Sequence, residues 1–191
     1  MRVFVAGSRS LRALTEDLRN RLSSVMSADG TVLVGDAKGA DLLVQEYLNE
    51  KRYSQVNVYA SGGTARHNLG GWPVVHVSTE EKRGTFNYYV AKDKKMAEDA
   101  DYGMMIWDGR SKGTLNDMIM LSDQEKTVLV YYLPINRFVI IRNRKTLTEF
   151  ISLCGKEASD MFSSLLKTSG RHFSNRAAQS SNKQISLFDN A

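Results

Sequence analysis

A short segment near the middle of the chain, Asp108–Thr114, carries residues suited to binding an anion. Its glycines let the backbone approach a ligand, its Ser and Thr hydroxyls can donate hydrogen bonds, and its lysine supplies positive charge. A helix is expected to begin near Gly113, and the free N–H groups of a helix N-terminus favour phosphate. The spacing matches neither the P-loop nor the Gly-x-Gly-x-x-Gly fingerprint. The predicted ligand-binding residues here are Asp108, Gly109, Ser111, Lys112, Gly113 and Thr114.

Two further loops follow short apolar runs and have a similar character. The first, Gly7-Ser8-Arg9-Ser10, offers close backbone approach, hydroxyls and an arginine that can fork onto a phosphate. A tight turn with a solvated arginine explains the same residues equally well. The second, Gly35–Asp41, places small residues at an expected helix start, and Asp41 suits a cap or loop organiser better than a catalytic group. The predicted ligand-binding residues of both loops are Gly7, Ser8, Arg9, Gly35, Gly39, Ala40 and Asp41.

A long glycine-containing loop over residues 60–73 is the third feature that suggests a binding site. Arg66 and Asn68 are predicted to bind the ligand, with the loop closing over a ribose or a base. His67 is better explained as a surface residue than as an acid–base catalyst, and Trp72 as a buried anchor than as a stacking platform. Three histidines and one cysteine make no convincing transition-metal set, so neither a metal nor a cofactor is predicted.

The elements that must position these loops alternate between short apolar runs and helical patterns. This alternation predicts a Rossmann-like α/β fold, an open parallel sheet flanked by helices. In such a sheet, ligands collect at the carboxyl ends of the strands, where the loops lie. A first helix is expected over Leu11–Val25, and a small helical extension over Leu147–Leu166. The expected strands are Arg2–Ala6, Thr31–Val34, Gln55–Tyr59, Val74–Val77, Tyr102–Trp107 and Thr127–Leu133, with Arg137–Ile141 as an edge hairpin.

The composition of the 191 residues, 42% hydrophobic and 25% charged, is that of an ordinary soluble globular protein. No apolar run approaches the roughly 18 residues of a membrane span. The absence of a signal-peptide layout and the single Cys154 predict a cytoplasmic protein without internal disulfides. The net charge is +5, of which residues 167–191 contribute +3 through four basic residues and one acidic residue. The remaining body is too evenly charged to indicate a duplex-DNA face, whereas phosphate attraction by the tail, and so DNA as a partner, stays open.

Several of these motifs occur in an order that resembles the SLOG superfamily, over about residues 1–133. The motifs are Gly7-Ser8-Arg9, Gly39-Ala40-Asp41, the helix containing Lys92-Asp93, and Gly113-Thr114. The superfamily includes lonely-guy phosphoribohydrolases, DNA-processing proteins and nucleotide-sensing domains. The resemblance implies a Rossmann-like domain, a nucleotide-related ligand and a homodimer. Lys92 and Asp93 fall where many members have Arg-Asn facing the ligand, although a solvated helix face accounts for them equally well.

The resemblance also implies a candidate catalytic residue, Asp117. The superfamily's phosphoribohydrolases carry Gly-Gly-x-Gly-Thr-x-x-Glu, in which the glutamate takes part in cleaving an N-glycosidic bond. Gly113 and Thr114 match this pattern, Arg110 and Ser111 replace the preceding glycines, and Asp117 takes the place of the glutamate. An aspartate in the first turn of a helix is also favoured by the helix dipole without any ligand.

The last eight residues, 184–191, form a separate feature after the polar stretch 167–183, which is predicted to be a flexible linker beyond a domain of residues 1–166. They resemble the bacterial sliding-clamp-binding motif, which implies that a clamp is the partner. Packing back onto the domain or onto a second subunit is the alternative. The predicted partner-binding residues are Gln184, Ile185, Leu187 and Phe188.

Three functions therefore stand side by side. The favoured one is binding of a nucleotide-derived phosphate ligand, as a sensor or as an accessory protein tethered to the clamp. The second is hydrolysis of an N-glycosidic bond in a nucleotide by Asp117, and the third is single-stranded DNA binding in DNA processing.

Overall fold

The structure, a computed structural model, describes residues 1–168 and contains one seven-stranded sheet, in the order β4-β3-β2-β1-β5-β6-β7. Six strands are parallel, and β7 runs antiparallel to β6 at the edge. This confirms the predicted Rossmann-like α/β fold. The strands are β1 (Arg2–Gly7), β2 (Thr31–Gly35), β3 (Val56–Ser61), β4 (Val74–Val77), β5 (Tyr102–Trp107), β6 (Val128–Tyr132) and β7 (Arg137–Ile141).

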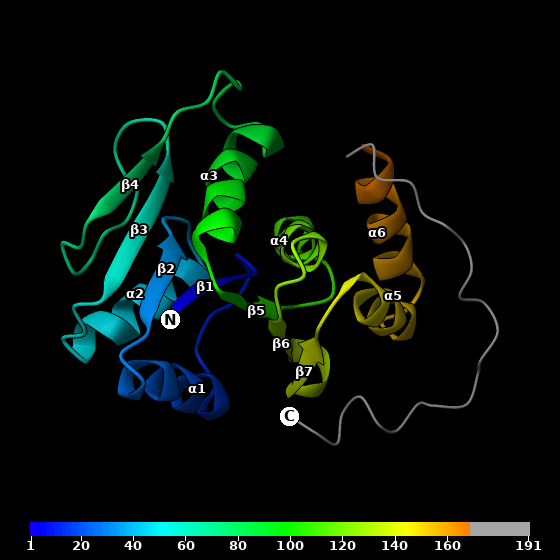
Figure 1. Ribbon diagram of the computed structural model, residues 1–191, viewed down its shortest axis with the longest axis horizontal. Helices are drawn as coiled ribbons and strands as arrows, with labels where there is room; N and C mark the ends of the chain where they lie inside the picture. Colours follow the sequence, from blue (N-terminus) through cyan, green and yellow to red (C-terminus); the bar gives the residue numbers. More distant parts are fainter. Residues whose placement is uncertain (169–191) are drawn as a thin grey trace.

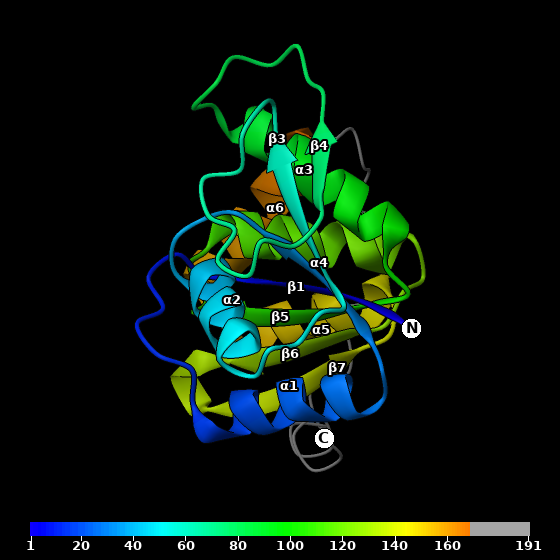
Figure 2. The ribbon, with the colours of Figure 1, turned by 90° about the vertical axis from the view of Figure 1, so that its left-hand side faces the viewer.

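Helices cover both faces of this sheet (Figures 1 and 2). The α1 and α2 helices pack on one face, and α3 to α6 on the other. The helices are α1 (Glu16–Ser27), α2 (Ala40–Glu50), α3 (Phe86–Asp99), α4 (Lys112–Asp123), α5 (Arg144–Leu153) and α6 (Lys156–Thr168). Strand and crossover helix therefore alternate from β1 through α4, except that a loop without a helix joins the parallel strands β3 and β4.

The central strands are continuous apolar runs because both of their faces are covered. In β1, Val3 and Val5 face α1 and α2, while Phe4 faces α3 and α4, and all three are fully buried. Burying about 100–150 Å² of apolar side chain at each such position supplies the main driving force for folding. The register of β1 places Gly7 opposite Ile106 of β5, so the loops after these two strands begin side by side.

The predicted edge hairpin and helical extension are present. A short 3₁₀ turn, η1 (Leu133–Ile135), reverses the chain after β6, and Asn136 adopts a left-handed conformation with φ 50°. The α5 and α6 helices then pack Phe150 and Phe162 into the core beside α4. A capping box of Asn143 and Thr146 starts α5. This extension packs on the same face of the sheet as α4, and α5 also contacts the edge strand β7.

Two predicted boundaries are corrected. The first helix begins at Glu16 rather than at Leu11, because the Thr15 hydroxyl accepts the Leu18 N–H and the acidic residues 16 and 17 favour a helix N-terminus. Leu14 is buried all the same, from the preceding loop. The α6 helix reaches Thr168, two residues into the predicted linker.

The rest of that linker and the predicted clamp-binding segment 184–191 lie outside the described residues. Within residues 1–168, no helix combines the length and apolar character needed to cross a membrane.

Candidate functional site

The predicted loops meet at the point where the strand order reverses, between β1 and β5. Asp108 after β5 joins them, because its carboxylate accepts hydrogen bonds from Ser8 at 2.5 Å and from Ser10 at 3.0 Å. The Ala40 N–H at the start of α2 donates to the Ser8 carbonyl at 3.1 Å, which ties in the loop after β2. Ligands of open α/β sheets bind at such a crevice beyond the carboxyl ends of the strands.

A cleft of about 490 Å³ opens at this crevice, between the three loops and the first turns of α3 and α4. Its size matches that of small-ligand sites in general. Four basic and four acidic side chains line it, so the cleft is polar and nearly neutral overall. The predicted residues that line it are Gly7, Ser8, Arg9, Asp41, Lys92, Asp93, Asp108, Ser111, Lys112, Gly113, Thr114 and Asp117.

One end of the cleft is formed by the N-terminus of α4. No side chain among the described residues caps this helix, because the Ser111 hydroxyl pairs with the Thr114 hydroxyl at 2.9 Å instead of with a backbone N–H. A Cβ at Gly113 would meet nothing within 4 Å, so the space above the first turn is open. Lys112 lies at the same end, with its ammonium 4.4 Å from the centre of the Phe86 ring. This end can hold an anion.

Asp108 organises the loop before α4. Its Oδ1 accepts the backbone N–H groups of Arg110 at 3.0 Å and Ser111 at 2.7 Å, while Oδ2 faces Ser8 and Ser10. Burial raises its pKa, but these hydrogen bonds outweigh burial and hold the pKa below its ordinary value. Asp108 is therefore ionised at neutral pH and fixes the shape of the anion-binding end.

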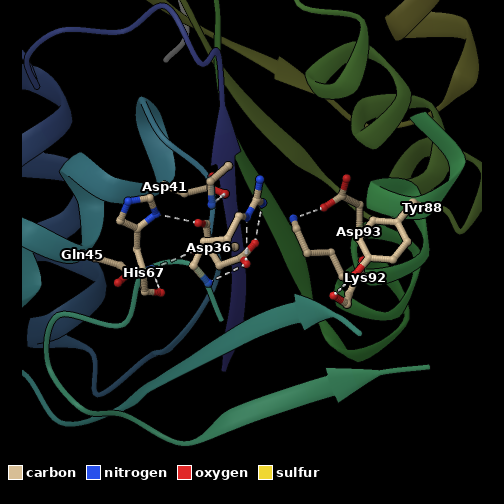
Figure 3. Close-up of polar contacts among 11 residues, drawn as sticks. Asp36, Asp41, Gln45, His67, Tyr88, Lys92 and Asp93 are labelled. Atoms are coloured by element: carbon tan, nitrogen blue, oxygen red, sulfur yellow. Dashed lines mark hydrogen bonds and ion pairs between the residues drawn. The ribbon is translucent and has the colours of Figure 1, made fainter. Parts of the chain in front are cut away.

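The floor of the cleft is a buried cluster of charges made of Asp41, Lys92, Asp93 and Asp117, which we call the charge cluster. The Lys92 ammonium pairs with Asp93 Oδ1 at 2.5 Å, and Figure 3 shows this pair beside Asp36 and Asp41. All four side chains belong to residues less than 10% exposed. Asp117 Oδ1 is buried with no hydrogen-bond partner in the described part of the chain.

The pKa shifts in the charge cluster follow from burial and from the interactions between one cation and its neighbouring carboxyl groups. Burial lowers the pKa of Lys92, but Asp93 and Asp41 outweigh burial and raise it above its ordinary value. Burial and then Asp93 raise the pKa of Asp117 well above its ordinary value. Lys92 therefore stays charged, and the raised pKa of Asp117 means that this carboxyl group retains a proton more readily than an exposed aspartate does.

The free energy of unfolding should depend on pH because of Asp41. Burial, opposed by Lys92 and reinforced by Asp93, raises its pKa from 3.8 to about 6. The folded chain then holds this proton more tightly than the unfolded chain, so the stabilisation is complete below pH 3.8 and is lost as the pH rises through about 6. Relative to wild type, Asp41→Asn should gain about 2–3 kcal/mol in free energy of unfolding over this window. Urea titrations across the window test this, and parallel profiles for the two proteins would contradict it.

The predicted loop residues Arg66 and Asn68 have mainly structural partners. Arg66 donates hydrogen bonds to the carboxylate of the buried Asp36 from Nε at 3.0 Å and from Nη2 at 2.6 Å. Its backbone N–H also donates to Asp36. Asn68 makes two hydrogen bonds to the backbone of Trp72, and Trp72 is buried as predicted. Asn68 does not line the cleft, whereas Arg66 lines an adjoining cavity.

Four predicted residues do not line the cleft, but their backbone packs against the residues that do. Gly35 lies under the charge cluster, where a Cβ would collide with Asp41 and approach the Lys92 ammonium to 2.7 Å. Gly39, with φ 78°, packs against the backbone of Arg9. Ala40 bonds to Ser8 as described above, and Gly109, with φ 81°, makes the turn beside Tyr132. These residues shape the site without lining it.

Several lining residues were not predicted, notably Tyr89, Phe86 and Asp36. Tyr89 is the most central, because the guanidinium carbons of Arg9 and Arg66 lie 5.0 and 4.8 Å from its ring centre. Its position three residues before Lys92 on α3 was the available signal, since residues three apart share a helix face. Asp36 directly follows β2, at the carboxyl end of a strand, and could have been selected on that ground.

Within residues 1–168, no group of three or more His, Cys, Asp or Glu side chains is arranged to hold a metal ion. In the charge cluster the positive charge comes from Lys92, whose ammonium pairs with Asp93 and interacts electrostatically with Asp41 and Asp117.

Comparison with known proteins supports the fold. The sequence matches no protein-family model and no curated protein. Among solved structures, the chain is similar to DNA processing protein A from Helicobacter pylori, with 13% sequence identity and a TM-score of 0.55. The match covers 88% of this chain and 81% of the other, whose structure was described for its single-stranded DNA binding mode. At this identity, the similarity establishes a shared Rossmann-like architecture.

Proposed function

We propose that the cleft binds a nucleotide or a nucleotide-derived phosphate ligand, and that the chain is a divergent member of the SLOG superfamily. The observation that carries this proposal is the N-terminus of α4, which opens into the cleft without a side-chain cap. Its free N–H groups and the helix dipole favour a phosphate, and Lys112 adds a positive charge beside them.

The other walls of the cleft suit the rest of a nucleotide. Phe86, Tyr89 and Val90 offer apolar and aromatic surface to a base. The carboxyl groups of the charge cluster line the floor of the cleft and suit sugar hydroxyls. One arrangement suits all these walls of the cleft. The phosphate lies at the α4 end, the sugar over the charge cluster and the base against α3.

Replacing Lys112 with methionine should weaken binding of adenosine monophosphate by about tenfold, because a charge-assisted contact to phosphate is lost while the packing of the alkyl chain is kept. Lys145→Met is the matched control, since Lys145 is an exposed lysine on α5, away from the cleft. Isothermal titration calorimetry measures both affinities. Equal affinities for the two variants would argue against the phosphate position.

Hydrolysis of the N-glycosidic bond is a second candidate function, favoured by the buried Asp117 in the cleft. A carboxyl group with a raised pKa and a free oxygen can donate a proton or stabilise an oxocarbenium-like centre. Chromatography of the same mixtures decides this point. Release of free adenine by the wild type but not by Asp117→Asn would establish cleavage. If the nucleotide stays intact with both proteins, the cleft binds the nucleotide without cleaving it.

Single-stranded DNA is a further candidate ligand, because DNA processing protein A from Helicobacter pylori, which has this fold, is described as binding it. A strand of DNA presents the same phosphate and base chemistry repeated along its length. Competition of oligothymidine with adenosine monophosphate for the cleft separates the two ligands. A strand that binds without displacing the nucleotide would have to use another surface.

A further inference from the structure

Tyr89 on α3 lies between two open spaces. One is the cleft, and the other is an adjoining cavity of about 350 Å³ whose lining includes Asp36, Arg66 and Tyr88. A side chain between two such spaces has room to change its rotamer unless other groups hold it. The proposed arrangement packs the base against this part of α3, so the base wall depends on the groups that fix Tyr89.

Arg66 is an anchored group that contacts the Tyr89 ring. Its guanidinium carbon lies 4.8 Å from the ring centre. The same guanidinium donates two hydrogen bonds to Asp36, a residue that is 3% exposed and follows directly after β2. Burial raises the pKa of Asp36, but the hydrogen bonds from Arg66 and the nearby positive charges outweigh burial and lower it, so the pair stays ionised. Arg66 is therefore fixed to the end of a strand, and its cation–π contact fixes Tyr89 in turn.

Tyr88 and Arg9 also contact the Tyr89 ring. The Tyr88 ring packs edge to face against it with 5.3 Å between centres, and the Tyr88 hydroxyl donates to the Ser61 carbonyl at 2.6 Å, at the end of β3. Arg9, from the loop after β1, places its guanidinium carbon 5.0 Å from the ring centre. Because Arg9 is exposed, the firmly held contacts are those of Arg66 and Tyr88.

We propose that Arg66 is a positioning residue for base recognition. Held by Asp36, it fixes the Tyr89 ring as the wall against which the base packs. The cleft then selects a nucleotide over a sugar phosphate that lacks a base. This inference rests on the proposed function, because it takes the base to lie against α3. Arg66 acts through Tyr89, since Arg66 lines the adjoining cavity and not the cleft.

Adenosine monophosphate and ribose 5-phosphate are the probes, because they share the sugar and the phosphate and differ by the base. Isothermal titration calorimetry gives the affinity for the first divided by the affinity for the second, which we call the base ratio. In wild type the base ratio should be about ten, the order expected for stacking of one base on an aromatic wall. Tyr89→Leu should lower it to about two, with the affinity for ribose 5-phosphate unchanged.

Arg66→Lys tests the positioning role. Lysine keeps the positive charge that the buried Asp36 requires, so the fold is retained, but it lacks the planar fork that holds Asp36 and the Tyr89 ring together. The base ratio should fall about threefold, with the affinity for ribose 5-phosphate unchanged. In a Tyr89→Leu background the same substitution should have no further effect, because Arg66 acts only through that ring.

Two further variants support this comparison. Asp36→Asn combined with Arg66→Met removes both charges of the pair, leaves no buried charge unpaired, and should lower the base ratio by the same factor as Arg66→Lys. Arg137→Lys is the matched control, because Arg137 is an exposed arginine on β7 outside both spaces. It should keep the wild-type base ratio.

Each other outcome is decisive. An unchanged base ratio in Arg66→Lys would overturn the inference, because Tyr89 would then be held without Arg66. An equal loss of affinity for both probes would also overturn it, since Arg66 would support the cleft as a whole. A fall in the base ratio that persists in the Tyr89→Leu background would mean that Arg66 contacts the ligand directly. A wild-type base ratio close to one would remove the base from this wall and leave the phosphate position intact, whereas binding of neither probe would refute the proposed function itself.

Discussion

Replacing Lys92 with methionine should lower the free energy of unfolding by about 3–5 kcal/mol, the usual cost of removing one partner from a buried ion pair. Methionine keeps most of the volume of the side chain, so the loss is electrostatic. It leaves Asp41, Asp93 and Asp117 together on the buried floor of the cleft without their shared cation. Chemical denaturation at neutral pH measures the change.

Lys94→Met is the matched control, because Lys94 is exposed on the same helix. It should change stability by less than about 0.5 kcal/mol. Two further measurements identify the cause. The Lys92→Met protein should regain stability as the pH falls toward about 5, since the carboxyl groups then take up protons. Asp93→Asn added to it should also restore part of the loss. A small and pH-independent effect of Lys92→Met would mean that the lysine only fills space.

Lys92 also shows where sequence reasoning reached its limit. The helical spacing correctly placed Lys92 and Asp93 on α3, but a solvated charged face explained them as well as a buried one. The two interpretations differ only in which residues surround Lys92, and these residues come from β2, α2 and α4. The sequence shows that Lys92 and Asp93 are adjacent and oppositely charged, but it does not show whether they are buried. Tertiary packing determines their burial.

The sheet was predictable because each central strand is an apolar run that ends at a glycine or a polar residue. The ends of β1, β2 and β5 can be located in the sequence because the apolar run stops there. The loops that carry the candidate ligand-binding residues follow directly after these strands. The start of α1 was not predictable from apolar spacing alone, because Leu11 and Leu14 continue the helical period from outside the helix. The cap at Thr15, with the acidic residues after it, overrides that pattern.

The aromatic and arginine contacts of the site were the least predictable part. Arg66 was selected as a ligand contact from its loop alone, whereas its partner Asp36 lies 30 residues earlier in the chain. Tyr89 lies three residues before Lys92, but Tyr88 lies four residues before it, so helical spacing did not distinguish the two tyrosines. Both roles come from the packing of α3 on β1, β2, β3 and β4, which no local pattern encodes.

Gly7→Val should destabilise the fold by more than about 3 kcal/mol, because it inserts three carbon atoms where none fits. A Cβ at Gly7 would lie 2.5 Å from the Ile106 carbonyl oxygen, 2.7 Å from Ile106 Cβ and 2.9 Å from Ala40 Cβ. The first of these is a backbone atom of β5, the neighbouring strand, so relief requires β1 and β5 to move apart. Such a movement would also separate Ser8 from Asp108 and so open the crevice.

Gly113→Ala is the matched control within the same cleft, because a Cβ there meets nothing within 4 Å and the residue lies in the first turn of α4. It should raise stability by about 0.5–1 kcal/mol, the gain expected from replacing glycine by alanine in a helix. Thermal denaturation of the two variants should therefore shift the midpoint in opposite directions. If Gly7→Val retained wild-type stability, β1 and β5 could not be packed as closely as the structure has them. The closeness of these strands is what brings Ser8, Asp108 and the start of α4 to one ligand.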